Sequence, residues 1–344
     1  MKKNFILILL VLMIAGCSAD GTGSAEENEK IVLKVATHTN TNHYSYRLGI
    51  EPWAKRVTEL TNGQVEFEFF PNEQLGKAKD MYSMLKNNAV DITYVVYVQD
   101  IMPLTDLVAL PDMYETAYQG TRAYWDLASK GSLLNDTFLP NGIRPIFTFA
   151  VSPSTIGTTK EKIELVEDLK GMRVRSAGGS ADVALDALKG TPVSIGITET
   201  REALVKGMVN GVMTSWLSIS PYQLEQPLKY LVENAPLNGF AGLFAINEKR
   251  FQSLPKDIQD AIATANEEIV VSMAENIKEE EQVEIDSFKE QGIELYQLND
   301  GTVKQMKEML SPITEQWIKE MEDKGLDARK VYEEFMEAAK KHSE

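Results

Sequence analysis

The spacing of apolar residues in the N-terminal third of the chain predicts alternating strands and helices. Residues 31–37 form a short, mostly apolar run, which predicts a buried strand. Residues 46–60 carry apolar side chains at helical spacing, and residues 64–70 alternate as a strand does. A helix at 79–87 and an apolar strand at 89–97 follow. Strands that alternate with helices in this order indicate an α/β fold.

The same turn from helix to strand occurs once in each half of the chain. In both places a helix ends at a residue that tolerates left-handed backbone, and an apolar strand begins directly afterwards. Two related α/β lobes that face each other would explain this repeat. The matching positions are Leu85, Asn88, Val90 and Asp91 in one half and Leu204, Gly207, Val209 and Asn210 in the other.

The order of the predicted elements divides the chain into two lobes and a long helix. Residues 31–150 make the first lobe, to which residues 241–255 return, and residues 151–240 make the second. From Pro255 to Gly292 apolar residues recur at three- and four-residue steps, which predicts one long helix. At 1.5 Å per residue this helix would extend roughly 50 Å, enough to back both lobes.

Two further predictions concern the acidic residues of the long helix and the secondary structure of the C-terminal segment. The acidic cluster at Glu279, Glu280 and Glu281 is expected to form a solvated face. Residues 293–344 predict a strand and then two helices, at about 302–324 and 327–342, with their apolar faces in the core.

The N-terminal segment has the pattern of a secretory signal. Two lysines precede an apolar run at 5–14 that is too short to span a bilayer comfortably. We expect residues 1–16 to be removed as a signal peptide. Residues 17–30, rich in Gly, Ser and Glu, are expected to form a flexible tether.

The sequence Ile14-Ala15-Gly16-Cys17 resembles the lipobox of bacterial lipoproteins, in which small residues admit the peptidase and the thiol is acylated. Cys17 is the only cysteine, so no intrachain disulfide and no cysteine metal cluster can form. We therefore expect Cys17 to carry the lipid that holds the protein on the membrane. A plain signal peptide with an incidental cysteine is the alternative.

Composition excludes several classes of function. The chain has 51 acidic and 35 basic residues and a net charge of −16, which argues against nucleic acid and against attachment to anionic lipid by charge. No nucleophile elbow, P-loop, G-x-G-x-x-G or H-E-x-x-H motif is present, and there are only three histidines. We therefore predict a protein that is not an enzyme and that has no metal site or cofactor.

One basic residue stands where an α/β sheet binds ligands. Residues 172–175 alternate between apolar and basic side chains, which predicts a short strand, and small residues follow at 176–180. Arg175 would lie at the carboxyl end of this strand, beside the crevice in which open α/β sheets bind ligands. Its planar guanidinium matches a carboxylate in bidentate geometry. The alternative is an arginine that is exposed or paired with a structural aspartate.

Polar and aromatic residues are expected at the ends of strands in the first lobe. His38 begins a polar loop after the first strand, and His38 or His43 could donate to an anion unless the loop is merely exposed. Tyr94 and Tyr97 would lie at the mouth of the lobe, either as core packing or as the apolar wall of a pocket for an organic anion.

Several motifs resemble those of the DctP-like family, the extracytoplasmic solute-binding proteins of TRAP transporters. The stretch from Asp168 to Arg175 resembles the family's DLKG-x-x-x-R signature. The other similar stretches occur in the family's order between about residues 32 and 290. They are the first strand, a TNG-x-V and P-x-x-QLG element at 61–76, a stretch at 203–211 similar to AL-x-x-G-x-VDG, and an N…LP pair at 247–255.

The resemblance implies a two-lobe fold of the periplasmic-binding-protein type, with Arg175 as the main anchor for a small organic carboxylate. It implies a receptor that delivers this solute to the membrane subunits of a TRAP-type transporter. The protein would be lipid-anchored outside the cell membrane, in a periplasm or at the outer cell surface.

The chain departs from the family's pattern at two places in the implied site. Many members carry a second arginine where this chain has Ser154 and Thr155, which suggests a monocarboxylate more than a dicarboxylate. Many also carry a ligand-binding asparagine where this chain has Thr214, followed by Trp216. We expect Thr214 and Ser154 or Thr155 to be polar supports, and Trp216 to be either an apolar wall or inter-lobe packing.

Three other functions stay open from the sequence. A receptor for a sugar, a metal or another cation would not need Arg175. An extracytoplasmic enzyme would convert its ligand chemically. A sensor would present the ligand to a receptor kinase instead of a transporter.

Overall fold

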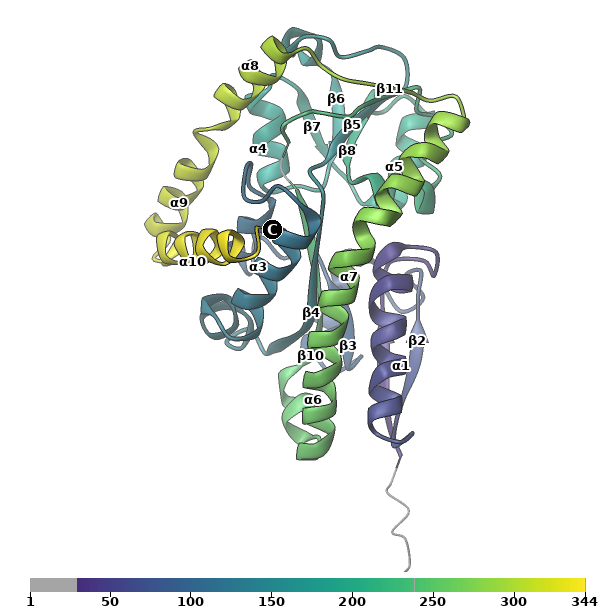
Figure 1. Cartoon of the computed structure of the whole chain (residues 1–344), viewed down its shortest axis with the longest axis vertical. Helices are drawn as coiled ribbons and strands as arrows, with labels where there is room; N and C mark the ends of the chain where they lie inside the picture. The colour runs from purple at the N-terminus through teal and green to yellow at the C-terminus, as the bar shows by residue number, and fades with distance from the viewer. Residues whose placement is uncertain (1–29, 238, 344) are drawn as a thin grey trace, which may run out of the picture.

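The computed structural model describes residues 30–237 and 239–343 and has the two-lobe α/β architecture expected from the sequence (Figure 1). Each lobe contains one sheet. In the first sheet β1 pairs in parallel with β2 and β3, and β10 lies antiparallel between β3 and β4. Its strands in spatial order are β2 (Val65–Phe70), β1 (Ile31–Ala36), β3 (Ile92–Val95), β10 (Phe240–Asn247) and β4 (Ile143–Val151).

Helices cover this first sheet because their apolar faces need a buried partner. Trp53 is fully buried, and its indole nitrogen donates to Asn266 of the long helix at 2.8 Å. The helices of the first lobe are α1 (Glu51–Leu60), α2 (Met81–Lys86), α3 (Ala117–Ser129) and α6 (Glu248–Ser253), with short turns η1 (Ser45–Ile50), η2 (Ala78–Asp80), η3 (Pro103–Ala109) and η4 (Leu133–Phe138).

The second sheet mixes parallel and antiparallel pairs. Strand β6, which carries Arg175, lies in parallel between β7 and β8. The strands in spatial order are β11 (Glu294–Tyr296), β9 (Tyr230–Val232), β5 (Thr155–Thr158), β8 (Gly211–Thr214), β6 (Arg173–Ser176) and β7 (Thr191–Ser194). The helices of this lobe are α4 (Ser180–Ala187) and α5 (Ile197–Val205), with turns η5 (Val166–Leu169), η6 (Trp216–Ser218) and η7 (Ser220–Tyr222).

The helix α7 (Lys256–Glu290) runs along both lobes, as Figure 1 shows. It packs against α1, α3 and β4 in the first lobe and against η6 and β11 in the second. The expectation of a solvated acidic cluster was wrong for Glu281, which is only 5% exposed. Its carboxylate accepts hydrogen bonds from the backbone nitrogen and the hydroxyl of Ser152, in the crossover between the two sheets. Glu281 is buried because this face of α7 meets the crossover.

The C-terminal segment forms three helices instead of the two expected. The helix expected at 302–324 is interrupted next to Pro312, because proline has no N–H to donate and its ring clashes with the preceding turn. The three helices are α8 (Asp300–Leu310), α9 (Ile313–Asp323) and α10 (Ala328–Lys341).

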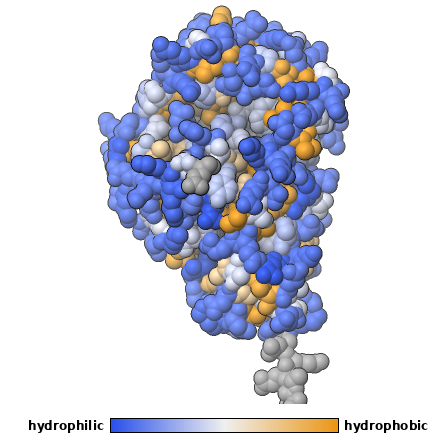
Figure 2. All heavy atoms as spheres, in the orientation of Figure 1, coloured by the Kyte–Doolittle hydropathy of each residue, from blue (hydrophilic) through white to orange (hydrophobic). Residues whose placement is uncertain are grey.

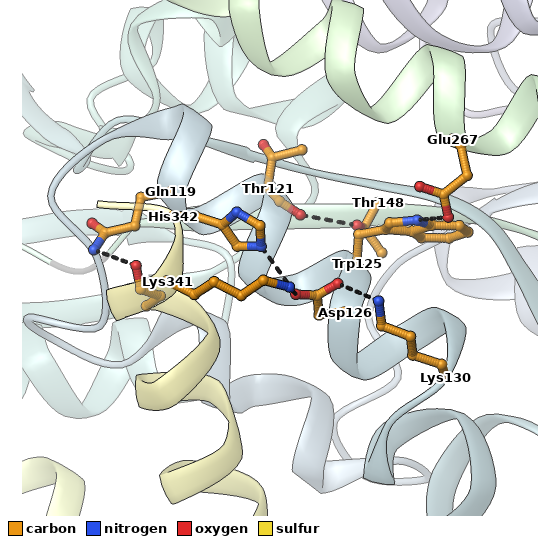
Figure 3. A network of polar contacts seen from close by, with 10 residues as sticks. Gln119, Thr121, Trp125, Asp126, Lys130, Thr148, Glu267, Lys341 and His342 are labelled. Carbon is orange, nitrogen blue, oxygen red and sulfur yellow. Dashed lines mark hydrogen bonds and ion pairs between the residues drawn. The ribbon is translucent and has the colours of Figure 1, made fainter. Parts of the chain in front are cut away.

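Helix α10 returns to the first lobe and packs on α3 (Figures 1 and 3). The carboxylate of Asp126 on α3 lies 3.0 Å from Nε2 of His342 and 3.0 Å from Nζ of Lys130. On the same helix, the indole nitrogen of Trp125 donates to Glu267 of α7 at 2.7 Å. Helix α3 is thus tied both to the long helix and to the end of the chain.

The visible face of the molecule is predominantly hydrophilic, with apolar residues in separate patches (Figure 2). Within the described ranges, no helix combines the length and the apolar character needed to cross a membrane.

Candidate ligand-binding site

A cavity of about 130 Å³ lies between the two lobes. Residues at and just beyond the ends of β3 and β10 line it from the first lobe, and residues of β6 and β8 line it from the second. A protein cavity of about 150 Å³ is large enough to hold benzene. The space therefore suits a small molecule of roughly one ring.

Arg175 supplies the positive charge in this cavity. It is 3% exposed, its Nε donates to the backbone oxygen of Ile195 at 2.9 Å, and within the described ranges no carboxylate lies within 4.0 Å to form an ion pair with it. Burial lowers the pKa of the guanidinium, and the nearby Tyr97, Tyr222 and Asp182 oppose this effect. Arginine stays protonated in proteins, so the cavity contains a buried cation that has no ion-pair partner in the described ranges.

Two tyrosines lie beside the guanidinium and line the same cavity. Tyr97 has a φ of 55°, in the left-handed region that a bulky residue seldom adopts. Such strain is concentrated at functional sites. Tyr222 comes from the opposite lobe, and within the part of the chain described here its buried hydroxyl has no hydrogen-bond partner. Burial raises the pKa of Tyr222, so this hydroxyl is a neutral donor and acceptor.

Two histidines line the first-lobe side of the cavity. His38 is 4% exposed and its ring stacks on Tyr94, with centroids 4.8 Å apart. Burial lowers the pKa of His38 to about 4 and also lowers the pKa of His43. Nδ1 of His43 lies 2.8 Å from the hydroxyl of Ser45, whereas the buried Nδ1 of His38 has no partner among residues 30–237 and 239–343.

One acidic side chain also lines the cavity. Asp106 in η3 accepts a hydrogen bond from the backbone nitrogen of Ser180, the first residue of α4, at 2.8 Å. Burial raises the pKa of Asp106 to about 6. This contact joins a first-lobe turn to a second-lobe helix. A second contact between the lobes runs from the Asn40 side chain to the backbone oxygen of Pro221, at 2.9 Å.

The rest of the lining is largely apolar. Val98, Val108, Ile197, Met213 and Phe240 all contribute to it. Such a surface favours an apolar part of a ligand, while the few polar groups fix its orientation. In the described ranges Arg175 is the only lysine or arginine of the lining, and no group of three or more His, Cys, Asp or Glu side chains could hold a metal ion.

The structure brings most of the residues expected from the sequence to this cavity. Six of the eight line it: His38, Tyr94, Tyr97, Ser154, Arg175 and Thr214. Thr155 does not, because its hydroxyl points across the sheet and donates to the backbone oxygen of Val232 at 2.7 Å. Trp216 is 5% exposed within the core of the second lobe, beside Ile219 and Leu224, and we no longer place it in the wall. Cys17 lies outside the described residues.

Sequence reasoning missed Tyr222, Asp106 and Met213. Tyr222 follows the turn-forming pair Ser220-Pro221 in the loop after β8, which is the available signal for a residue at a strand end. Asp106 lies in a turn far from any predicted strand end, and no local pattern marks it.

The sequence matches the family model described as bacterial extracellular solute-binding protein, family 7 (DctP), over residues 36–320. The chain belongs to this family. The family assignment made from the sequence motifs is thus confirmed, and so is the two-lobe fold with its long spanning helix.

Several proteins are similar to this DctP family member. A solute-binding protein of Albidiferax ferrireducens is 24% identical over 272 residues, 76% of this chain and 77% of its own length. A marine metagenome protein, described as a TRAP solute-binding protein specific for aromatic acids and crystallised with 3-hydroxybenzoate, has a TM-score of 0.85 and 22% identity. The match covers 92% of this chain and 100% of that chain. A TRAP solute-binding protein of Rhodoferax ferrireducens, with copurified benzoate, has a TM-score of 0.82, 20% identity and coverages of 91% and 99%.

Proposed function

We propose that this DctP family member is an extracytoplasmic receptor that binds a small organic monocarboxylate between its lobes and delivers it to a TRAP-type transporter. The buried Arg175, without an ion pair in the described ranges, carries this proposal. A carboxylate would supply an ion-pair partner and accept two parallel hydrogen bonds from the guanidinium. Solved relatives of the same fold that contain benzoate or 3-hydroxybenzoate support this class of ligand.

Ligand binding would favour the closed arrangement of the lobes. Arg175 and Thr214 lie in the second lobe, whereas Tyr94 and Tyr97 lie in the first, so one molecule touching all four connects the lobes. A ligand shifts an equilibrium between open and closed forms by its differential affinity for them. The closed receptor is then the form presented to the transporter.

We further propose that a lipid on Cys17 holds the receptor at the outer side of the cell membrane. The lipobox-like sequence before Cys17 supports this anchor. Replacing Cys17 by Ser is expected to release the protein from the membrane fraction, and a Cys17→Ser protein that stays bound would contradict it.

The test of the carboxylate site is a thermal-shift screen of the protein without residues 1–17 against mono-, di- and keto-carboxylates, aromatic acids and neutral sugars. A micromolar ligand at millimolar concentration should stabilise the fold by about 4 kcal/mol. Arg175→Ala should lower affinity at least about a hundredfold, because hydrogen bonds to a charged group contribute roughly 1.5–3 kcal/mol each.

Arg173→Ala is the matched control, because Arg173 is exposed in the same strand and does not line the cavity. Its affinity should equal that of the unaltered protein. Preferential binding of a neutral sugar, or affinity that is indifferent to Arg175, would refute the proposed anchor.

A further inference from the structure

His38 has hydrogen-bonding capacity that the described part of the protein does not use. The side chain is 4% exposed, lines the cavity, and is held in place by stacking on Tyr94. Its Nδ1 is buried without a partner in the described ranges. No hydrogen bond to either ring nitrogen is present in the described ranges, and the ring lines the cavity, so a ligand there can supply the missing partner.

The chemistry of His38 identifies the kind of ligand group it would meet. Burial lowers the pKa of His38 to about 4, so near neutral pH the imidazole is uncharged, with one nitrogen as donor and the other as acceptor. A neutral imidazole offers no positive charge to offset the desolvation of a second carboxylate. It is well suited to a hydroxyl group, which can both donate and accept a hydrogen bond.

The second lobe contributes to the lining a residue with a similar unpaired atom. The hydroxyl of Tyr222 is buried and lacks a partner within the described residues, and its ring centroid lies 5.7 Å from that of His43. Tyr222 also lies near the guanidinium of Arg175, where it opposes the lowering of the pKa of that group by burial. Residues with unsatisfied polar atoms therefore line both sides of a cavity whose remaining lining is largely apolar.

We infer that His38 recognises a hydroxyl group of the ligand, so that the preferred solute is a hydroxy-substituted monocarboxylate with an apolar or aromatic body. This inference rests on the proposed function, because the carboxylate must be held at Arg175. The ligand hydroxyl then pairs with His38 from the first lobe, while the carboxylate pairs with the second. His38 determines specificity and Arg175 determines the class of ligand.

The test compares acids that differ only by a hydroxyl group. Calorimetric titration of the protein without residues 1–17 would use benzoate against its three hydroxybenzoate isomers, and phenylacetate against mandelate. At least one hydroxy acid should bind about five- to tenfold more tightly than its parent, the range expected for one added hydrogen bond that also satisfies a buried partner. In His38→Phe, which keeps an aromatic ring against Tyr94, this ratio should fall to about one.

Two further variants control the interpretation. His38→Asn keeps a hydrogen-bonding side chain and should restore part of the preference. His342→Phe makes the same substitution at a histidine on the Asp126 network, away from the cavity, and should leave the ratio unchanged.

The outcomes separate the inference from the function on which it rests. Equal affinity for parent and hydroxy acids, or a preference that persists in His38→Phe, would overturn the role of His38 while leaving the carboxylate receptor intact. The first result would mean that water satisfies His38. Failure of every acid to bind, or binding indifferent to Arg175→Ala, would overturn the proposed function itself.

Discussion

Replacing Asp106 by Asn should make the protein more stable at neutral pH but not in acid. The carboxylate lines the cavity and accepts a hydrogen bond from the backbone nitrogen of Ser180, and burial raises its pKa from 3.8 to about 6. The folded protein therefore binds more protons than the unfolded chain between about pH 4 and pH 6. Stability contributed by this group is present below about pH 4 and is lost as the pH rises through 6.

The size of the effect follows from the same shift in pKa. A shift of one pKa unit corresponds to about 1.36 kcal/mol. The ionised Asp106 therefore lowers the free energy of unfolding by up to about 3 kcal/mol at pH 7. The side chain is only partly buried and faces a cavity, so we expect about 1–2 kcal/mol. An asparagine oxygen at the same place can still accept from Ser180 and carries no charge to desolvate.

The assay is urea unfolding of the unaltered protein and of Asp106→Asn from pH 4 to pH 7.5. The free energies of unfolding should coincide near pH 4 and diverge as the pH rises. Asp112→Asn is the matched control, since Asp112 is exposed in a loop and its φ of 57° is one that asparagine also adopts. If the Asp106→Asn curve runs parallel to that of the unaltered protein over the whole range, the assignment of a buried, protonatable carboxyl is refuted.

Two other substitutions probe the contacts that hold the lobes together. Glu281→Ala should lower the free energy of unfolding by about 2–4 kcal/mol, because it leaves the Ser152 nitrogen unpaired. Glu281→Gln should lower it little, because burial raises the pKa of Glu281 and so already disfavours a charge at this place. Denaturant unfolding at pH 7 checks this, and equal losses in both variants would contradict it. Asn40→Ala removes the bond to Pro221 and the bond that Asn40 accepts from the backbone nitrogen of Asn42, and it should weaken ligand binding about two- to tenfold and slightly lower the melting temperature of the ligand-free protein. Titration together with a melting curve checks it, and an unchanged affinity would show that this contact takes no part in closure.

The local sequence pattern was sufficient to predict that a residue lines the cavity where a single strand determines its position. Arg175 reaches the cavity because alternation places it in a strand and the small residues after it end that strand. His38 and Tyr94 reach it for the same reason, since parallel strands bring their carboxyl ends to one edge of the sheet. These positions follow from strand geometry alone.

The sequence did not predict the positions of side chains that depend on tertiary contacts or on a change of backbone direction. Neighbouring residues of a strand face opposite sides, and the sequence did not show which of Ser154 and Thr155 would face the cavity. Trp216 was expected at the end of the strand that carries Thr214, as an apolar wall or as inter-lobe packing, but the chain enters a 3-10 turn there and the ring lies in the core of the second lobe. Glu281 is a similar case in a helix. Its burial depends on the crossover that packs against α7, and the helical pattern alone does not show this contact.

The distribution of charge in the cavity favours a monocarboxylate over a dicarboxylate. In the described ranges the lining contains one guanidinium and one ionisable carboxyl, and both histidines are kept neutral by burial. A second ligand carboxylate would have to be desolvated without a cationic partner, which is costly in a buried site, and would meet Asp106 as a like charge whenever that group is ionised. A hydroxyl group meets neither penalty and satisfies the unpaired nitrogen of His38. The same few side chains therefore attract one negative charge, discourage a second, and leave a neutral polar group as the feature that distinguishes one acid from another.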